Sequence, residues 1–244
     1  MDEIFLLDEE EIFLLIGSIF TLLFNGSFIF YFIKLFKSQI NLIDIPILTI
    51  FLSYLNGLVW FTYSKYILHD IMRNVYLISS IISIIFIIIY LIYEYKTDKT
   101  DAILNILLLI SSTLALNKFL TEALNDEDKI KFCCYYSIIS IILGILTSIF
   151  RAIMIKSNSN LNIYVGIFLI LMCGANLFYG LFYKELLLII TNASGIYGGL
   201  AYLGFFYYLK INYTTLYFKE SGGDSVIDIE VKNDKQEKNN GGKK

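Results

Sequence analysis

A few polar and amphipathic side chains lie inside long apolar stretches of this sequence, where each needs a partner or a wet cavity. Asn176 and Asn192 carry amides, whose two donors and acceptor lone pairs suit the paired hydroxyl groups of a ligand. Trp60 and Tyr76 offer aromatic faces, and Asn74 stands two residues before Tyr76. Each residue also has a structural interpretation. The asparagines can bond neighbouring helices, Trp60 can lie at a membrane interface, and Tyr76 can pack in a core.

The apolar stretches lack the groups that catalysis or metal binding needs. The single histidine, His69, falls between two stretches, and no nucleophile–base pair or His/Cys/Asp/Glu cluster is evident. Cys133, Cys134 and Cys173 fall inside stretches, which argues against a disulfide framework and favours buried thiols. We therefore predict no catalytic residues, no metal site, no cofactor and no enzyme activity. A formal net charge of −3 does not suggest a nucleic-acid partner.

Composition and spacing together predict a membrane protein. Of 244 residues, 57% are hydrophobic and 17% charged, against about 25% charged in soluble proteins. Roughly 20 apolar residues in a helix cross a bilayer, and a helix satisfies its own backbone there. We therefore predict an all-α protein with seven transmembrane helices. The apolar stretches lie at about residues 12–34, 46–64, 74–93, 102–117, 132–150, 162–183 and 186–209.

The distribution of positive charge predicts the orientation of the chain. With the N-terminus outside, thirteen Lys and Arg residues lie inside and six outside, largely because of the C-terminal tail. We therefore expect an extracellular segment at 1–11 and a disordered cytoplasmic tail at 213–244. The expected location is the plasma membrane, with the Golgi or another internal membrane as the alternative.

Two parts of the chain resemble each other. Trp60 and Tyr63 align with Asn176 and Tyr179 at an offset of 116, and FKSQI at 36–40 resembles IKSNS at an offset of 119. The first three stretches therefore match the last three, and the fourth has no partner. An odd linker helix leaves the two copies parallel, related by an axis along the membrane normal. The predicted parts are a first three-helix repeat (12–98), a linker helix (99–121) and a second three-helix repeat (130–212).

These motifs resemble those of the SWEET sugar-transporter family, within the PQ-loop-like superfamily. Lys37-Ser38 and Lys156-Ser157 follow the first helix of each repeat. LNGLVWFTYS at 55–64 looks like the family's N-x-L-x-W-x-x-Y-G. CGANLFYG at 173–180 and TNASG at 191–195 look like its W-x-x-Y-G and N-x-x-G. The resemblance covers about residues 11 to 212.

The resemblance implies a bidirectional, uncoupled facilitator of mono- or disaccharides that works by alternating access in a lipid bilayer. Asn192 matches the family's sugar-contacting asparagine, and Asn176 stands where its second tryptophan belongs. Trp60 occupies the matching place in the first repeat. Tyr76, with Asn74 nearby, falls where the first pocket asparagine belongs. Whether copies of the chain form a homo-oligomer is left open.

The chain departs from the family in its prolines, which act as pivots in four helices. Pro46 is the only proline, and it lies farther before Trp60 than the family spacing places it. Gly26 and Gly144 can soften helices near two of the other positions, so we expect them as hinge candidates beside Pro46. Close helix packing is the alternative for both glycines.

Three other functions are alternatives. An amino-acid exporter of the PQ-loop type would resemble a Pro-Gln motif in two loops, which this sequence lacks. A seven-helix receptor is expected to carry an outer cysteine pair and a proline in its last span, and neither is present. A non-transporting relative of the sugar carriers is the third.

Overall fold

The computed structural model describes most of the chain, and the remainder carries some of the predictions. The described residues are 9–66, 70–154 and 161–212. The predicted cytoplasmic tail, most of the N-terminal segment, His69 and the Lys156-Ser157 pair lie outside them.

Eight α-helices and two short helical turns follow one another along the described chain. The helices are α1 (Glu9–Gly26), α2 (Ile29–Phe36), α3 (Ile47–Tyr66), α4 (Asp70–Thr97), α5 (Lys99–Lys118), α6 (Asp126–Met154), α7 (Ile163–Tyr183) and α8 (Leu186–Asn212). The turns are η1 (Leu42–Asp44) and η2 (Phe119–Ala123). Seven segments of the described chain are long and apolar enough to cross a membrane, with α1 and α2 together forming the first. The prediction of seven membrane-spanning helices is confirmed.

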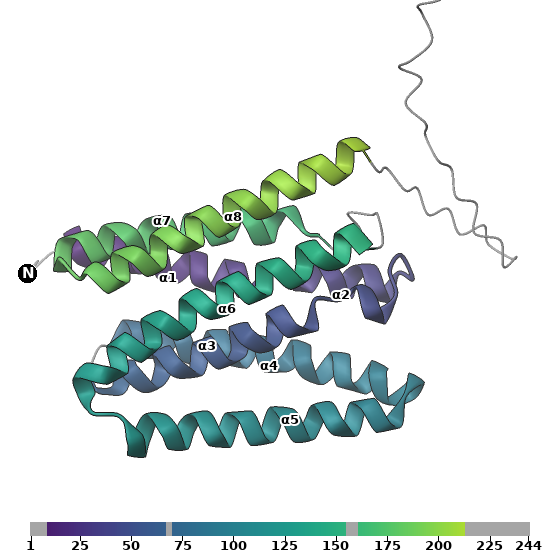
Figure 1. Ribbon diagram of the computed structural model, residues 1–244, viewed down its shortest axis with the longest axis horizontal. Coiled ribbons are helices and arrows are strands. Elements are labelled where there is room, and N and C mark those ends of the chain that lie inside the picture. The colour runs from purple at the N-terminus through teal and green to yellow at the C-terminus, as the bar shows by residue number, and fades with distance from the viewer. Residues whose placement is uncertain (1–8, 67–69, 155–160, 213–244) are drawn as a thin grey trace, which may run out of the picture.

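The helices form two similar units and one additional helix (Figure 1). In the first unit α4 packs against both α1 and α3, and in the second α8 packs against both α6 and α7. The units meet where α1 contacts α7 and where α3 contacts α6. Helices α1, α3 and α4 therefore correspond to α6, α7 and α8. Under this correspondence each contact within or between the units has an equivalent contact. This is the predicted pair of parallel three-helix repeats joined by a linker helix.

Small side chains bring the helices of each unit close together. A Cβ atom on Gly57 of α3 would clash with Ser80 of α4, and one on Gly195 of α8 would clash with Cys173 of α7. Gly57 and Cys173 are related by the offset of 116. The corresponding pair of helices is therefore in close contact in both units. The glycine lies on α3 in the first unit and on α8 in the second. Small residues permit such approach where lipid supplies no hydrophobic driving force.

The first membrane span is interrupted at Gly26, between α1 and α2. The Phe28 and Tyr31 amides donate to carbonyls three residues back, those of Asn25 and Phe28, so regular α-helical bonding lapses here. A Cβ atom on Gly26 would meet nothing within 4 Å. Close packing therefore does not explain this glycine, whereas its conformational freedom suits the break.

The other two hinge candidates occupy different settings. Pro46 immediately precedes α3, where a missing N–H costs no helical hydrogen bond. Gly144 lies inside α6, which continues without a break from Asp126 to Met154. A Cβ atom on Gly144 would lie 3.1 Å from Thr49 of α3, so the structure shows close packing between the units at this position.

Helix α5 packs on the first unit, against α4 and more lightly against α3 (Figure 1). Its deepest polar contact joins it to Glu94 near the end of α4. The Asn105 amide nitrogen lies 3.0 and 2.9 Å from the two carboxylate oxygens of Glu94. Glu94 is buried and lies within α4, one residue past the predicted apolar stretch at 74–93.

Candidate functional site

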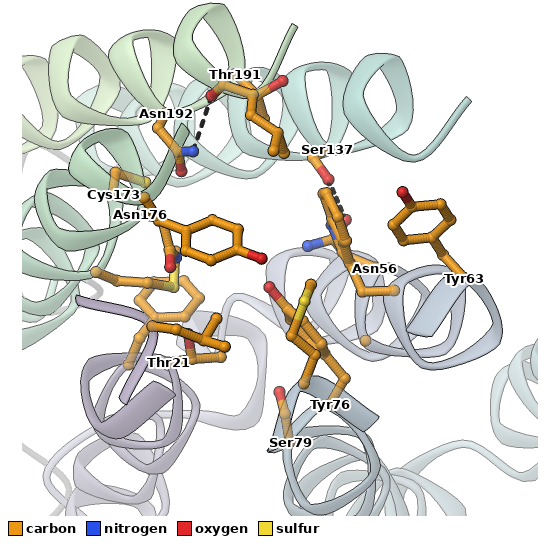
Figure 2. Close-up of a pocket in the computed structure, with 18 of the residues that line it drawn as sticks. Thr21, Asn56, Tyr63, Tyr76, Ser79, Ser137, Cys173, Asn176, Thr191 and Asn192 are labelled. Atoms are coloured by element: carbon orange, nitrogen blue, oxygen red, sulfur yellow. Dashed lines mark hydrogen bonds between the residues drawn. The ribbon is translucent and has the colours of Figure 1, made fainter. Parts of the chain in front are cut away.

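A central cavity of about 360 Å³ lies between the two units. Side chains from α1, α3, α4, α6, α7 and α8 line it, so both units contribute. The labelled residues of Figure 2 surround this space, with Asn176, Asn192 and Cys173 on one side and Asn56 and Tyr63 on the other. Cavities of this size at the interface of structural repeats are typical ligand sites.

The cavity reaches the end of the bundle where α1 begins and where α7 turns into α8, called here the N-terminal end. Tyr183 and Glu185 belong to this turn, and both are exposed as well as lining the cavity. Lys184 between them adopts a left-handed conformation with φ 55°, and the Glu185 amide donates to the Gly180 carbonyl. This helix cap reverses the chain and sets the mouth of the cavity.

Four of the five residues singled out from the sequence line this cavity. They are Trp60, Tyr76, Asn176 and Asn192. Asn74 is exposed and is not among the lining residues. The structure therefore brings the aromatic and amide candidates together and leaves Asn74 apart from them.

Aromatic side chains of the first unit form one wall of the cavity. The rings of Trp60 and Tyr76 stack with centroids 5.7 Å apart and an interplanar angle of 19°. Tyr63 meets Trp60 edge-on at 5.9 Å. Only 6% of Trp60 is exposed, so its ring faces the interior of the bundle and not the lipid.

A polar relay fixes the orientation of the Trp60 ring. The indole Nε1 donates to the Ser137 hydroxyl at 2.8 Å. Ser137 in turn lies 2.7 Å from Asn56 Oδ1, within donating distance. Because the indole N–H is already bonded, Trp60 presents its ring to the cavity and no free donor. Neither Asn56 nor Ser137 was among the candidate residues of the sequence, and both line the cavity. A serine inside an apolar span was the available signal for Ser137.

Amides of the second unit form the facing wall. The Asn192 nitrogen donates to the Leu188 carbonyl at 2.8 Å, and among the described residues its oxygen has no hydrogen-bond donor. Asn176 makes no hydrogen bond within the described chain, and its amide packs so closely over Gly17 that a Cβ atom there would clash. This wall therefore offers unused amide groups to a ligand.

Asn25 differs from Asn176 and Asn192 because both polar atoms of its amide form hydrogen bonds within the first unit. Its nitrogen donates to the Thr21 carbonyl at 2.9 Å, and its oxygen accepts from Ser53 at 2.7 Å and Ser83 at 3.1 Å. These bonds join α1, α3 and α4. Asn25 is 3% exposed, so it stabilises the first unit, as interhelical amides do in membranes.

The lining is almost free of ionisable acids and bases. Among the described residues that line the cavity, Glu185 at the exposed mouth is the one carboxylate, and no Lys, Arg or His contributes. The site can therefore offer aromatic faces, hydroxyls and amides to a neutral, hydrogen-bonding molecule.

Comparisons with known proteins bear on the fold. No protein-family model and no curated protein sequence matches the chain. A solved structure, the 3.7 Å resolution structure of a eukaryotic SWEET transporter, matches with a TM-score of 0.60 and 20% sequence identity. The match covers 81% of this chain and 95% of that one. The chain is thus a multi-pass membrane protein with the fold of a SWEET transporter.

Proposed function

We propose that this protein is a bidirectional, uncoupled facilitator of mono- or disaccharides. The observation that carries the proposal is the central cavity, with an aromatic wall from one unit and an amide wall from the other. The likeness in fold to a SWEET transporter supports it.

The two walls match the two chemical faces of a sugar ring. A pyranose has C–H groups that stack on an aromatic ring and hydroxyls that exchange hydrogen bonds at its edge. Trp60 and Tyr76 supply the stacking surface. Asn192 supplies an acceptor oxygen, and Asn176 supplies both a donor and an acceptor. Tyr76 stands where the resemblance places a pocket asparagine, so in this protein a ring replaces an amide.

The lining also favours a sugar over an amino acid. A basic side chain commonly pairs with the carboxylate of a zwitterion, and no basic side chain of the described chain lines the cavity. Coupled carriers commonly place an ionisable residue at membrane depth. The carboxylate that lines the cavity, Glu185, lies at the exposed mouth. The buried Glu94 is not among the lining residues and bonds Asn105 of α5 instead. Net flux then follows the gradient of the substrate.

The proposed mechanism is alternating access, with the two units rocking about the central site. In the conformation described, the cavity opens at the N-terminal end. Gly26 supplies flexibility at the break between α1 and α2, with Pro46 and Gly144 as further candidate pivots. We propose the N-terminus outside and the C-terminus in the cytoplasm of a plasma-membrane protein, so that this cavity faces outward.

Counterflow in liposomes tests the proposal. The full chain is reconstituted, and uptake of labelled glucose or sucrose is measured against a preloaded unlabelled sugar. Uptake above protein-free liposomes is expected, in either direction and without a proton gradient. Labelled neutral amino acids serve as the comparison. Absence of sugar flux from folded, inserted protein, or a strict need for a proton gradient, would overturn the proposal.

A further inference from the structure

A second, smaller cavity adjoins the central one on the side away from the mouth. It measures about 70 Å³, enough for a few water molecules and too small for a sugar ring. The two cavities share Ser53, Asn56 and Met172 in their walls, and the smaller one ends at Tyr202. The two cavities are therefore adjacent, and together they mark a candidate path between the units.

The lining of the second cavity is rich in hydroxyl groups. Thr49, Ser140, Ser148 and Tyr202 all contribute to it. The Ser140 oxygen is buried and has no hydrogen-bond partner among the described residues. A buried hydroxyl without a partner is costly unless water or a ligand satisfies it. The cavity is therefore suited to polar, hydrogen-bonding occupants, although it lies within the membrane span.

Hydrogen bonds between the two units close the path at Tyr202. The Tyr202 hydroxyl lies 3.2 Å from the Tyr31 hydroxyl of α2 and accepts from the Asn162 backbone amide at 2.8 Å. The Asn162 side chain donates to the Ser27 carbonyl at 3.0 Å. Tyr202 and Asn162 belong to the second unit, whereas Ser27 and Tyr31 belong to the first. The bonds to Tyr31 and Ser27 therefore join the units.

The acceptor in the first unit exists because its span is broken. Ser27 lies between α1 and α2, where regular helical bonding lapses. Asn162 is the N-cap of α7, and its oxygen accepts from the Tyr164 amide at 3.1 Å. One side chain therefore starts a helix and holds the opposing unit. Tyr31 and Tyr202 are only 1% and 2% exposed, so opening this end requires water to enter a sealed contact.

We propose that Tyr202 and Asn162 form a hydrogen-bonded gate that closes this end and releases Tyr31 and Ser27 when it opens. The gate rests on the proposed transport function, because a gate has a role only where the path is used. Its position at the second cavity makes it, among the described residues, a barrier between a bound substrate and the opposite face.

Thiol accessibility tests the gate without any sugar. Ala152 of α6 is fully buried and packs in the same cluster as Tyr31 and Tyr202. In the full chain in nanodiscs, Ala152→Cys should react slowly with a membrane-impermeant maleimide. Adding Tyr202→Phe should raise that rate about tenfold, because a closed state loses hydrogen bonds of this strength. The chain without Ala152→Cys supplies the background from native cysteines.

A matched control and a second variant complete the experiment. Tyr197→Phe removes a hydroxyl from the same helix at a side chain that is 74% exposed, and the rate should not change. If Tyr202→Phe does not fold, Tyr31→Phe removes the contact from the other unit and should also raise the rate.

A cysteine at the mouth separates gating from local loosening. Ile130 lines the central cavity, so Ile130→Cys should react more slowly in the Tyr202→Phe background as the two ends alternate. An unchanged Ala152→Cys rate would overturn the gate. So would a faster Ala152→Cys rate with no change at Ile130→Cys, because that result indicates fraying of one end. Neither readout depends on sugar flux, so failure of the gate and failure of the proposed function are distinguishable.

Discussion

The two walls of the central cavity occupy equivalent places in the two units and have opposite chemistry. At the offset of 116, Trp60 corresponds to Asn176 and Tyr76 corresponds to Asn192. The first unit stacks two rings at its pair of positions, and the second presents two amides. The repeat therefore preserves the positions that face the cavity, whereas the chemical type of the side chain at each position differs between the units. The resulting cavity can hold an asymmetric molecule in one preferred orientation.

The difference between the walls extends to the helices that face them. Trp60 lies against Ser137 of α6, which accepts its indole N–H. Asn176 lies against Gly17 of α1, where not even a methyl group would fit without displacing the amide. The facing helix thus carries a hydroxyl where it meets a ring and a bare backbone where it meets an amide. Substitutions at these positions test whether the two walls have different roles.

Asn192→Ala should have the largest effect. It removes the acceptor oxygen of the amide wall, and uptake should fall at least about tenfold, since an unpaired ligand hydroxyl loses its hydrogen bond on desolvation. Uptake in reconstituted liposomes measures it. Asn74→Ala, at an exposed position outside the cavity, is the matched control and should leave uptake unchanged. Equal uptake by the Asn192 variant and the native chain would remove this residue from the proposed site.

Trp60→Ala should rank next. Loss of the stacking surface should raise the apparent KM roughly fivefold to tenfold, because ring contacts of this kind contribute about 1 kcal/mol or more. Trp60→Phe keeps a ring and should show a smaller rise. Concentration dependence of uptake separates the two variants. If alanine and phenylalanine behaved alike, stacking would not be the role of this wall.

Gly17→Ala should have an intermediate effect on the amide wall. The added methyl group must displace the Asn176 amide, so uptake should fall about threefold while the protein stays folded. Gly174→Ala on α7 meets nothing within 4 Å and serves as control. A neutral result at Gly17 would mean that the position of Asn176 does not matter to the substrate.

Tyr76→Phe should have the smallest effect. It keeps the stack on Trp60 and removes one hydroxyl, so uptake should change by less than about threefold. Tyr76→Asn makes the first wall resemble the second and removes the stacked ring, and it should cost more. Uptake by both variants, measured side by side, would show the reverse order if the hydroxyl and not the ring mattered.

The sequence supports the fold more fully than the site. Apolar length alone predicts the seven spans. The four residues that the repeat offset relates, Trp60, Tyr76, Asn176 and Asn192, all line the central cavity. Asn74 shows the limit of reading along the chain. Two residues along a helix correspond to a turn of about 200°, so a neighbour in sequence can lie on the opposite face.

Contacts between residues far apart in the chain could not be predicted from the sequence, for a different reason. Tyr31 and Tyr202 are 171 residues apart and are two of 19 tyrosines. A tyrosine in an apolar stretch can stack, face lipid or bond another hydroxyl, and only the packing of the two units decides which. Glu94 was overlooked because hydropathy ends a span at the first charge, whereas α4 continues to Thr97.

The contact between Glu94 and Asn105 joins the linker helix α5 to the first unit. It anchors α5 to α4 through a buried carboxylate, so we expect the linker helix to move with the first unit in the proposed rocking motion. Four spans would then move as one body and three as the other, despite the symmetry of the repeats. A spin-label distance between α4 and α5 should stay constant, while one between α5 and α6 should change.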